Sequence, residues 1–378
     1  MQKDRDTVNF RMQLTRAKKI ALASLIIVLL LSGLLLARYF SIDSSASERE
    51  QLLQLIPAGA SAVIYLDADE LRASSLLAKF YAWSALGSPD SEYSQFVQDT
   101  GFSYERDLKR IAIAISNQGA TSNVFAVADG KFDRKRIESF LRRNGKSSQQ
   151  GRWTVFQLNT LSNERQMSLA FLSDSRIAIF DSGNSSAPLA SAAKDPGRAE
   201  WSERFERLAG TPFFVVIRQD SAVQDAFNAA APGGLRSPQL SALLSQLQWL
   251  SISGKPDGDQ LRVVAEGECP SPATVSQLSE LLQGLLLLAQ NGLNDPQLRQ
   301  KMNPEERDAY LEMIKSADIQ RIDRGQWKSV RVVLAITPKF LDVARAASMA
   351  PPRQDGPTQA TLPSKSTKAA GQKTQKKK

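Results

Sequence analysis

The chain has 378 residues, of which 42% are apolar and 23% are charged, as expected for two or three globular domains with hydrophobic cores. It contains no histidine, which excludes every mechanism that needs an imidazole base, proton shuttle or metal ligand. The single cysteine, Cys269, excludes an intramolecular disulfide, a CxxC redox pair and a cysteine zinc site.

The net charge of +9 is concentrated at the two ends of the chain. Residues 1–19 carry six basic and two acidic side chains, and residues 351–378 carry seven basic and one acidic. Subtracting these two contributions, +4 and +6, leaves −1 for the 331 residues between them. A nucleic-acid-binding fold places its basic patch on the folded body, together with aromatic residues for stacking, so no nucleic acid is expected as a partner.

Residues 20–37 form an uncharged apolar run, IALASLIIVLLLSGLLLA. As a helix this run would extend ~27 Å, close to the thickness of a bilayer core. Six basic residues precede it, and Arg38 and Arg49 are the basic residues that follow closely. This bias predicts a single-pass signal anchor over 20–38 in the inner (cytoplasmic) membrane, with 1–19 as a cytoplasmic basic segment and the main domain extracytoplasmic or periplasmic.

A cleavable signal peptide is the alternative interpretation of this segment. Ser44-Ser45-Ala46 offers a small-x-small cleavage site. However, the apolar run is longer than the roughly 7–15 residues usual for a signal peptide, and no lipobox cysteine follows. We therefore favour an uncleaved anchor that binds the lipid bilayer through residues 20–37.

Residues 39–56 are predicted to form a polar stalk that ends in a helical turn, which Pro57 terminates. Residues 57–186 are predicted to form a first α+β unit, with helices over 70–85 and 133–144. Asp133 is the expected N-cap of the second helix, and Asn144-Gly145 its stop signal. Alternating β-branched and aromatic residues predict strands over 61–67, 109–116, 123–129, 152–158, 167–173 and 176–181.

A helical connection over 187–210 leads to residues 211–350, which are predicted to form a second α+β unit in the same order. TPFFVVIRQD resembles SAVIYLDAD, and the hairpin WLSISGKPDGDQLRVVAEGE resembles RIAIAISNQGATSNVFAVADGK. Both hairpins end in Ala-acid-Gly and precede a helix. In the second unit we expect helices over 221–229, 238–247, 272–290 (with Pro272 in its first turn) and 304–316, and strands over DIQRID and WKSVRVVLAIT.

The predicted fold class is therefore α+β: an N-terminal transmembrane helix followed by two tandem β-α-β-β-α-β units with mainly antiparallel sheets. Chance similarity between generic α+β segments is the alternative to a duplication. Residues 351–378 contain four prolines and no aromatic residue. They are predicted to form a disordered Lys-rich tail because they cannot bury enough apolar surface to fold.

Three segments carry a resemblance to a known family: IPAGASAVIYLDADELRASSL, GFSYERDLKRIAIAI and VADGKFDRKRIESFL. They resemble uncharacterised bacterial proteins with one N-terminal membrane span and an exported α+β region. The resemblance covers residues 50–185 and rests on Pro57, Gly101-Phe102, Arg106-Asp107-Leu108 and Gly130-Lys131-Phe132-Asp133. It implies an architecture and a location. The function of that family is unknown, so the resemblance transfers no catalytic residue.

Asp67, Asp69 and Glu70 lie where the first strand meets its helix. Paired carboxylates can perform acid/base or cation chemistry, but Asp69 also suits an N-cap and Glu70 a first-turn charge. A metal site would need further oxygen ligands at fixed spacing, and no DxDxDG-type loop occurs. Arg106-Asp107 could hold an anion, although a surface ion pair that fixes the loop is the simpler interpretation.

The remaining motifs assign no catalytic, cofactor-binding or metal residue, and no cofactor is expected. The loops at 117–123 and 254–259 fit hairpin turns and match neither GxxxxGK[ST] nor GxGxxG. The serines of 181–187 have no GxSxG context and no histidine to activate them. Cys269 is expected to be an inert buried thiol.

Two segments suggest partners. The leucine-rich helix over 276–290 is too short for a second membrane span and is expected to pack on a sheet or against an unknown protein partner. The Lys-rich tail could contact anionic envelope polymers or lipid headgroups, or could act only as a solubilising tail.

These features favour a membrane-anchored envelope protein that acts as a binding or scaffolding module. A carboxylate-dependent envelope hydrolase that uses Asp67 and Asp69 is the alternative, and it would need a cleft with two carboxylates ~5–10 Å apart. A sensing or gating role for a membrane partner is a third possibility, which the sequence does not separate from the first.

Overall fold

The computed structural model describes residues 47–75, 91–118, 121–159, 166–181, 198–219, 242, 245–325 and 327–349. The predicted membrane span, the Lys-rich tail, the expected helix at 221–229 and most of the one at 238–247 lie outside these residues. Within the described ranges, no helix has both the length and the apolar composition needed to cross a bilayer.

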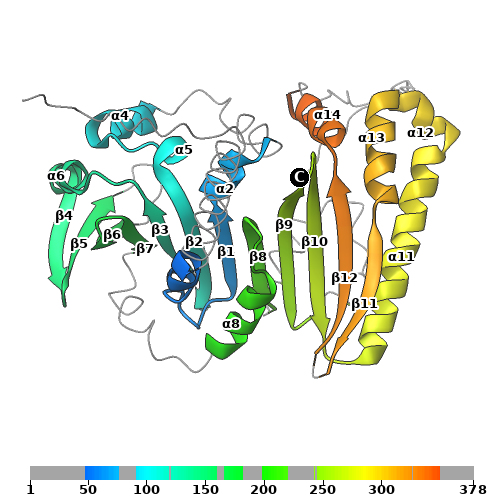
Figure 1. Ribbon diagram of the computed structural model, residues 1–378, viewed down its shortest axis with the longest axis horizontal. Helices are drawn as coiled ribbons and strands as arrows, with labels where there is room; N and C mark the ends of the chain where they lie inside the picture. The colour runs from blue at the N-terminus through cyan, green and yellow to red at the C-terminus, as the bar shows by residue number, and fades with distance from the viewer. Residues whose placement is uncertain are drawn as a thin grey trace, which may run out of the picture.

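The fold is α+β and is built on one large antiparallel sheet (Figure 1). The strands are β1 (Ala62–Asp67), β2 (Leu108–Gln118), β3 (Thr121–Gly130), β4 (Gly145–Gln150), β5 (Trp153–Asn159), β6 (Gln166–Ser173), β7 (Arg176–Asp181), β8 (Phe213–Arg218), β9 (Trp249–Asp257), β10 (Gln260–Cys269), β11 (Asp318–Arg324) and β12 (Trp327–Ile336). Their order across the sheet is β11-β12-β10-β9-β8-β1-β2-β3-β7-β6-β5-β4. Every neighbouring pair is antiparallel.

The regions expected to hold separate sheets are joined at the centre, where β1 pairs with β8. Val63 lies opposite Val216, and Tyr65 lies opposite Phe214 with the two rings stacked at 5.1 Å. If β1 or β8 were an edge strand, its outer backbone N–H and C=O groups would lack hydrogen-bond partners. Pairing the two strands provides these partners. In the part of the chain that the structure describes, the result is one continuous sheet of twelve strands instead of two sheets.

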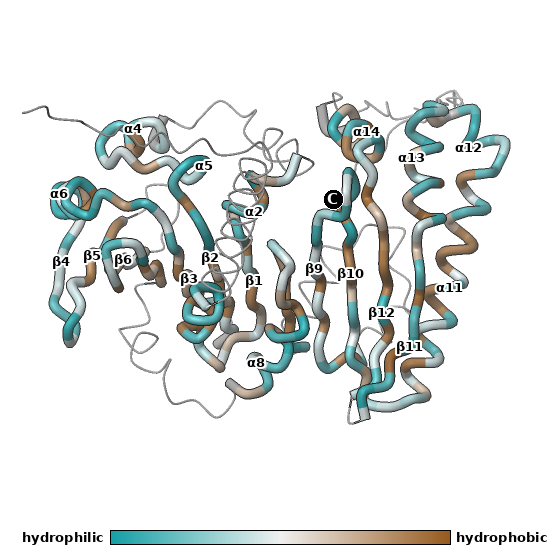
Figure 2. The backbone as a smooth tube through the Cα atoms, viewed as in Figure 1, coloured by the Kyte–Doolittle hydropathy of each residue, from teal (hydrophilic) through white to brown (hydrophobic). Residues whose placement is uncertain are grey.

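The helices are α2 (Ala68–Ala73), α4 (Ser91–Thr100), α5 (Tyr104–Asp107), α6 (Arg134–Asn144), α8 (Arg198–Arg207), α11 (Pro272–Asn294), α12 (Pro296–Lys301), α13 (Pro304–Lys315) and α14 (Pro338–Met349). Residues 47–53 are also helical, and we call them the lead helix. Apolar residues follow the central strands β1 and β2, whereas α6 is largely hydrophilic (Figure 2). The main core therefore lies along the middle of the sheet.

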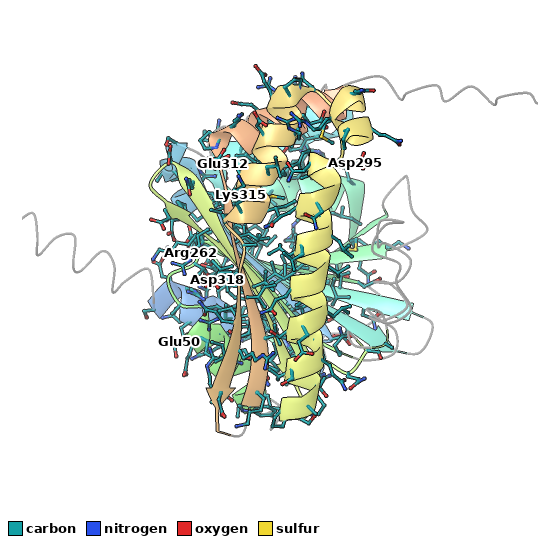
Figure 3. The ribbon with its side chains drawn as sticks, turned by 90° about the vertical axis from the view of Figure 1, so that its right-hand side faces the viewer. Glu50, Arg262, Asp295, Glu312, Lys315 and Asp318 are labelled. Atoms are coloured by element: carbon teal, nitrogen blue, oxygen red, sulfur yellow. The ribbon has the colours of Figure 1, made fainter. Side chains whose placement is uncertain are left out.

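Side-chain alternation divides the helices between two faces of the sheet. Tyr65 and Phe214 point toward the lead helix and α8, a side that we call the α8 face. Leu66 and Phe213 point to the opposite side, where Leu341 of α14 packs against their cluster. α11 runs along this second side against β10, β11 and β12 (Figure 3), and we call it the α11 face.

Several predicted elements are confirmed with small shifts in their bounds. Asp133 caps α6 by accepting a 3.1 Å hydrogen bond from the Arg136 amide. Pro272 lies in the first turn of α11, which Ser271 caps. The β9–β10 hairpin turns at Gly258, whose φ of +62° suits glycine.

Other expectations were wrong in detail. Helix α6 ends at Asn144, as the stop signal predicted, but the chain then continues directly into β4, a polar edge strand that was not expected. Helices α4, α5, α12 and α14 were not expected either. The described part of the predicted stalk, 47–56, packs into the main core through Leu52, Leu53 and Ile56. Its apolar residues sit three and four apart on one helix face, which is typical of a core helix.

Candidate functional site

A cavity of about 390 Å³ lies on the α8 face, between the lead helix, α8 and the end of β1. Its apolar wall includes the rings of Tyr65, Trp201 and Phe205. Acidic residues of four different segments complete the lining: Glu50, Asp67, Glu70 and Glu206. The cavity therefore combines aromatic surface with carboxylates.

The aromatic wall is a connected set of rings. The ring centre of Phe205 lies 5.7 Å from that of Trp201 and 5.6 Å from that of Phe214, and the Phe214 ring stacks on Tyr65. The Trp201 indole nitrogen donates a 3.2 Å hydrogen bond to the Ala58 carbonyl oxygen. This bond satisfies the buried indole N–H and fixes α8 against the segment that follows the lead helix.

Arg49 joins the lead helix to α8. Its Nη2 donates to the carbonyl oxygens of Phe205 at 3.3 Å and Leu208 at 3.0 Å, at the carboxyl end of α8. Its guanidinium lies 5.1 Å from the Tyr65 ring centre and 5.3 Å from that of Phe214. A cation at a helix carboxyl end is favoured by the helix dipole, so Arg49 holds one wall of the cavity in place.

Asp67 is the buried carboxylate of the cavity, and protein groups already surround it. Its Oδ1 accepts a 2.9 Å hydrogen bond from the Glu70 amide and so caps α2. Its Oδ2 accepts from Arg110 Nε at 2.8 Å and from the Tyr65 hydroxyl at 3.4 Å. Arg110 also pairs with Glu48 of the lead helix. Burial, followed by the charge of Asp67, raises the pKa of Tyr65 well above its ordinary value.

Glu70 differs from Asp67, because its side chain is exposed and lines the cavity rim. Partial burial and the nearby charge of Asp67 raise the pKa of Glu70. Of the three carboxylates singled out in the sequence, Asp67 and Glu70 thus share the cavity. Asp69 pairs with Arg72 on α2 and does not line it. The helix begins at residue 68, so the strand alternation that would have paired Asp67 with Asp69 ends before Asp69.

The Arg106–Asp107 pair fixes the short helix α5, which precedes β2. The Arg106 Nε and Nη2 donate to the Asp107 carboxylate at 2.9 and 2.6 Å, and the Ser103 amide donates to it at 2.9 Å. The hydrogen bond from Arg106 lowers the pKa of Asp107. These groups satisfy one another and leave Asp107 a structural residue.

Cys269 is 2% exposed at the end of β10, and burial raises the pKa of its thiol to about 11. In the described ranges, no group of three or more acidic or cysteine side chains is arranged to hold a metal ion.

The sequence did not point to Arg49, Trp201 or Phe205. Their segments were predicted only as stalk and helical connection. The spacing of Trp201 and Phe205, four residues apart, was a signal for one helix face but not for a cavity. The wall forms only where α8 packs over β1 and β8.

No family model and no curated protein sequence matches this chain. Among solved structures, crystal form III of TP0453 aligns with a TM-score of 0.42 and 9% identity, covering 79% of this chain and 98% of that one. Crystal form I of TP0453 aligns with a TM-score of 0.40 and 10% identity, covering 78% and 96%. A likeness at this level supports no statement about the function of this chain.

Proposed function

We propose that this chain is a membrane-anchored extracytoplasmic binding module of the cell envelope, and that the cavity between the lead helix and α8 holds its ligand. One observation carries this proposal: an aromatic cavity with Glu50, Glu70 and Glu206 among its lining residues. Such a lining suits a molecule with an apolar body and a cationic group, which the rings and carboxylates would contact respectively.

The charges near the cavity support a cationic ligand. Arg110 offsets the charge of Asp67, and Arg49 is committed to the end of α8. Lys255 and Arg49 lie near Glu70 and lower its pKa, but burial raises that pKa by more. Four lining carboxylates face three nearby cations, which leaves an excess of negative charge for the ligand. The carboxylates are Glu50, Asp67, Glu70 and Glu206, and the cations are Arg49, Arg110 and Lys255.

The predicted anchor would keep this cavity close to the bilayer. Residues 38–46 join the predicted span to the lead helix, and nine extended residues reach at most ~30 Å. Because the lead helix itself forms one cavity wall, a ligand there would lie near the membrane. In this proposal the Lys-rich tail contacts anionic envelope polymers or headgroups, and an unidentified protein is a further partner.

We also propose that the two halves are tandem copies of one β-α-β-β-α-β unit. From the centre outward, one half runs β1-β2-β3-β7 and the other runs β8-β9-β10-β12, with a helix after the second hairpin strand in each. The central strands pair antiparallel, as expected for two copies related by a two-fold axis between them.

The proposed binding is tested by calorimetry with octyltrimethylammonium as the probe and neutral octanol as the comparison. We expect saturable binding of the cation, weakened about fivefold in Glu70→Gln, since one charge contact contributes about 1 kcal/mol. Glu305→Gln, an exposed residue of α13, is the matched control and should bind as the native chain does. Equal binding of octanol, or unchanged affinity in Glu70→Gln, would contradict the proposal.

The proposed location is tested separately, by protease accessibility in intact and permeabilised cells with mass determination of the N-terminus. Digestion of the body once the outer barrier is opened, with residues 1–40 retained, would support the anchored topology. Protection until the inner membrane is broken would mean that the topology is inverted.

One observation favours a carboxylate-dependent hydrolase as a second candidate function. Asp67 and Glu70 line the same cavity, and the raised pKa of Glu70 suits a general acid. The ion pair with Arg110 makes Asp67 a poor second catalyst, because it occupies the carboxylate oxygen that would act. Hydrolysis of an envelope polysaccharide that Glu70→Gln abolishes would establish this alternative.

A further inference from the structure

A second charged site lies on the α8 face, in the half of the sheet away from the cavity. Here the end of α8 approaches β10, β11 and β12, and four arginines surround two buried glutamates. We call this set the arginine cluster. Its members are Arg204, Arg207, Arg324, Arg331, Glu266 and Glu268.

Glu266 is the centre of the cluster. It lies directly opposite Arg331, whose Nε and Nη2 donate to its Oε2 at 3.0 and 2.7 Å. Ser329 donates to Oε1 at 2.8 Å, Arg324 contacts both oxygens, and Arg207 lies 3.7 Å away. Each oxygen of this carboxylate thus accepts hydrogen bonds from two residues.

Glu268 lies two residues further along β10 on the same face. Its Oε2 accepts from Arg204 Nη2 at 2.5 Å, and its Oε1 accepts from Arg207. The Arg204 guanidinium lies 3.8 Å from the ring centre of Trp249 and 5.2 Å from that of Trp327. Packing against two indoles holds Arg204 in one orientation.

The cluster has two more positive charges than negative ones. The Nε atoms of Arg204 and Arg207 are buried and have no hydrogen-bond partner among the residues that the structure describes. Arg324 and Arg331 each keep 30% of their side chains exposed, so one side of the cluster is open. A partly buried excess charge is costly unless a counter-charge approaches it.

The positive charge continues along the same face. Arg262 and Lys255 are both exposed and lie directly opposite each other on β10 and β9. Like charges in this position repel, and a shared anion would relieve the repulsion. Asp318, on the edge strand β11, is an exposed carboxylate on this face and offsets one of the positive charges. Figure 3 labels both Asp318 and Arg262.

We infer that the open side of the arginine cluster binds an oxyanion, a phosphate or carboxylate group, through Arg324 and Arg331, with Arg262 and Lys255 extending the site along β10 and β9. Planar guanidinium groups bind such anions through paired N–H donors. The two buried glutamates hold the arginines in place, which orders the donors before the anion arrives. The arginine cluster is separate from the cavity, whereas Lys255 lies near Glu70 and Gly210 of the cavity lining. The inference does not depend on the proposed function.

The test is calorimetric titration of the full chain with inorganic pyrophosphate at low ionic strength, with acetate as the carboxylate probe. We expect one saturable site, and the tighter of the two probes identifies the preferred oxyanion. Arg262→Gln should weaken binding about threefold and Arg331→Gln about tenfold. Arg143→Gln, on the exposed face of α6 in the other half, is the matched control and should leave binding unchanged.

Arg331→Gln removes a partner of a buried glutamate, so its unfolding midpoint must be measured alongside. If it unfolds, Arg262→Gln decides the question, because that side chain is exposed and its loss should not affect folding. Absence of saturable binding, or equal binding in Arg262→Gln and Arg143→Gln, would overturn the inference and leave the cluster a structural network.

Discussion

Arg110 on β2 lies directly opposite Asp67 on β1, and its Nε donates a 2.8 Å hydrogen bond to the Asp67 Oδ2. Both side chains are buried where β1 ends and β2 begins, next to the cavity. Asp67 therefore links three parts of the structure: it caps α2, pairs two strands and, through Arg110, reaches the lead helix.

We predict that Asp67→Asn lowers the free energy of unfolding by about 3 kcal/mol, because it leaves a buried guanidinium with a single remaining partner. Asparagine still accepts the capping hydrogen bond, so the change isolates the ion pair. Asp69→Asn, which breaks an exposed pair with Arg72, should cost less than about 1 kcal/mol. Urea denaturation of the three proteins measures both effects, and equal costs would contradict the assigned role of Asp67.

We expect the stability of the protein to depend on pH through the carboxyl group of Glu266. Burial alone would raise its pKa, but hydrogen bonds from Arg324, Arg331 and Ser329 outweigh burial and lower the pKa to about 2. A carboxylate whose pKa falls on folding contributes stability above its unfolded pKa of 4.5, and this contribution is lost as the pH falls toward 2.

The expected contribution of Glu266 at neutral pH is about 3 kcal/mol. Denaturation measured between pH 6 and pH 2 should show this loss, and Glu266→Gln should remove the corresponding part of the slope while lowering stability at neutral pH. A slope unchanged by the substitution would show that other groups cause the acid sensitivity.

We expect position 145, a glycine in this chain, to tolerate no side chain. It lies where α6 ends and β4 begins, and a Cβ there would be 2.1 Å from the backbone oxygen of Gln157 on β5. Because backbone cannot move aside cheaply, Gly145→Ala should destabilise the protein by about 2 kcal/mol or more. A Cβ on Gly59 would meet nothing within 4 Å, so Gly59→Ala is the neutral control. Thermal melts of both variants check this difference.

We expect Cys269 to react slowly with thiol reagents. Only the thiolate reacts, and raising the pKa from 9.0 to about 11 lowers its fraction at pH 8 about a hundredfold. Burial slows the reaction further. Labelling with a disulfide reagent should therefore be at least a hundredfold slower in buffer than in 8 M urea. Comparable rates in the two conditions would mean that the end of β10 opens readily.

The sequence was a good guide to local structure because local structure depends on neighbouring residues. Alternating apolar residues identified the strands around Tyr65, Val127 and Val264, and the Asp133 cap and the Pro272 helix start followed from their own side-chain chemistry. It missed β4 because GKSSQQ is polar on both faces and lacks the alternation of a half-buried strand.

The sequence by itself determined the charge distribution, the absence of histidine chemistry and the order of most strands and helices, since these are properties of composition and of short segments. Only the tertiary structure decided that β1 and β8 join the strands into one sheet, that Glu70 rather than Asp69 shares a cavity with Asp67, and that four arginines surround Glu266 and Glu268. Each of these depends on pairs far apart in the chain. Sequence periodicity shows which face a residue occupies, but the partner that meets it there is chosen by strand pairing and packing.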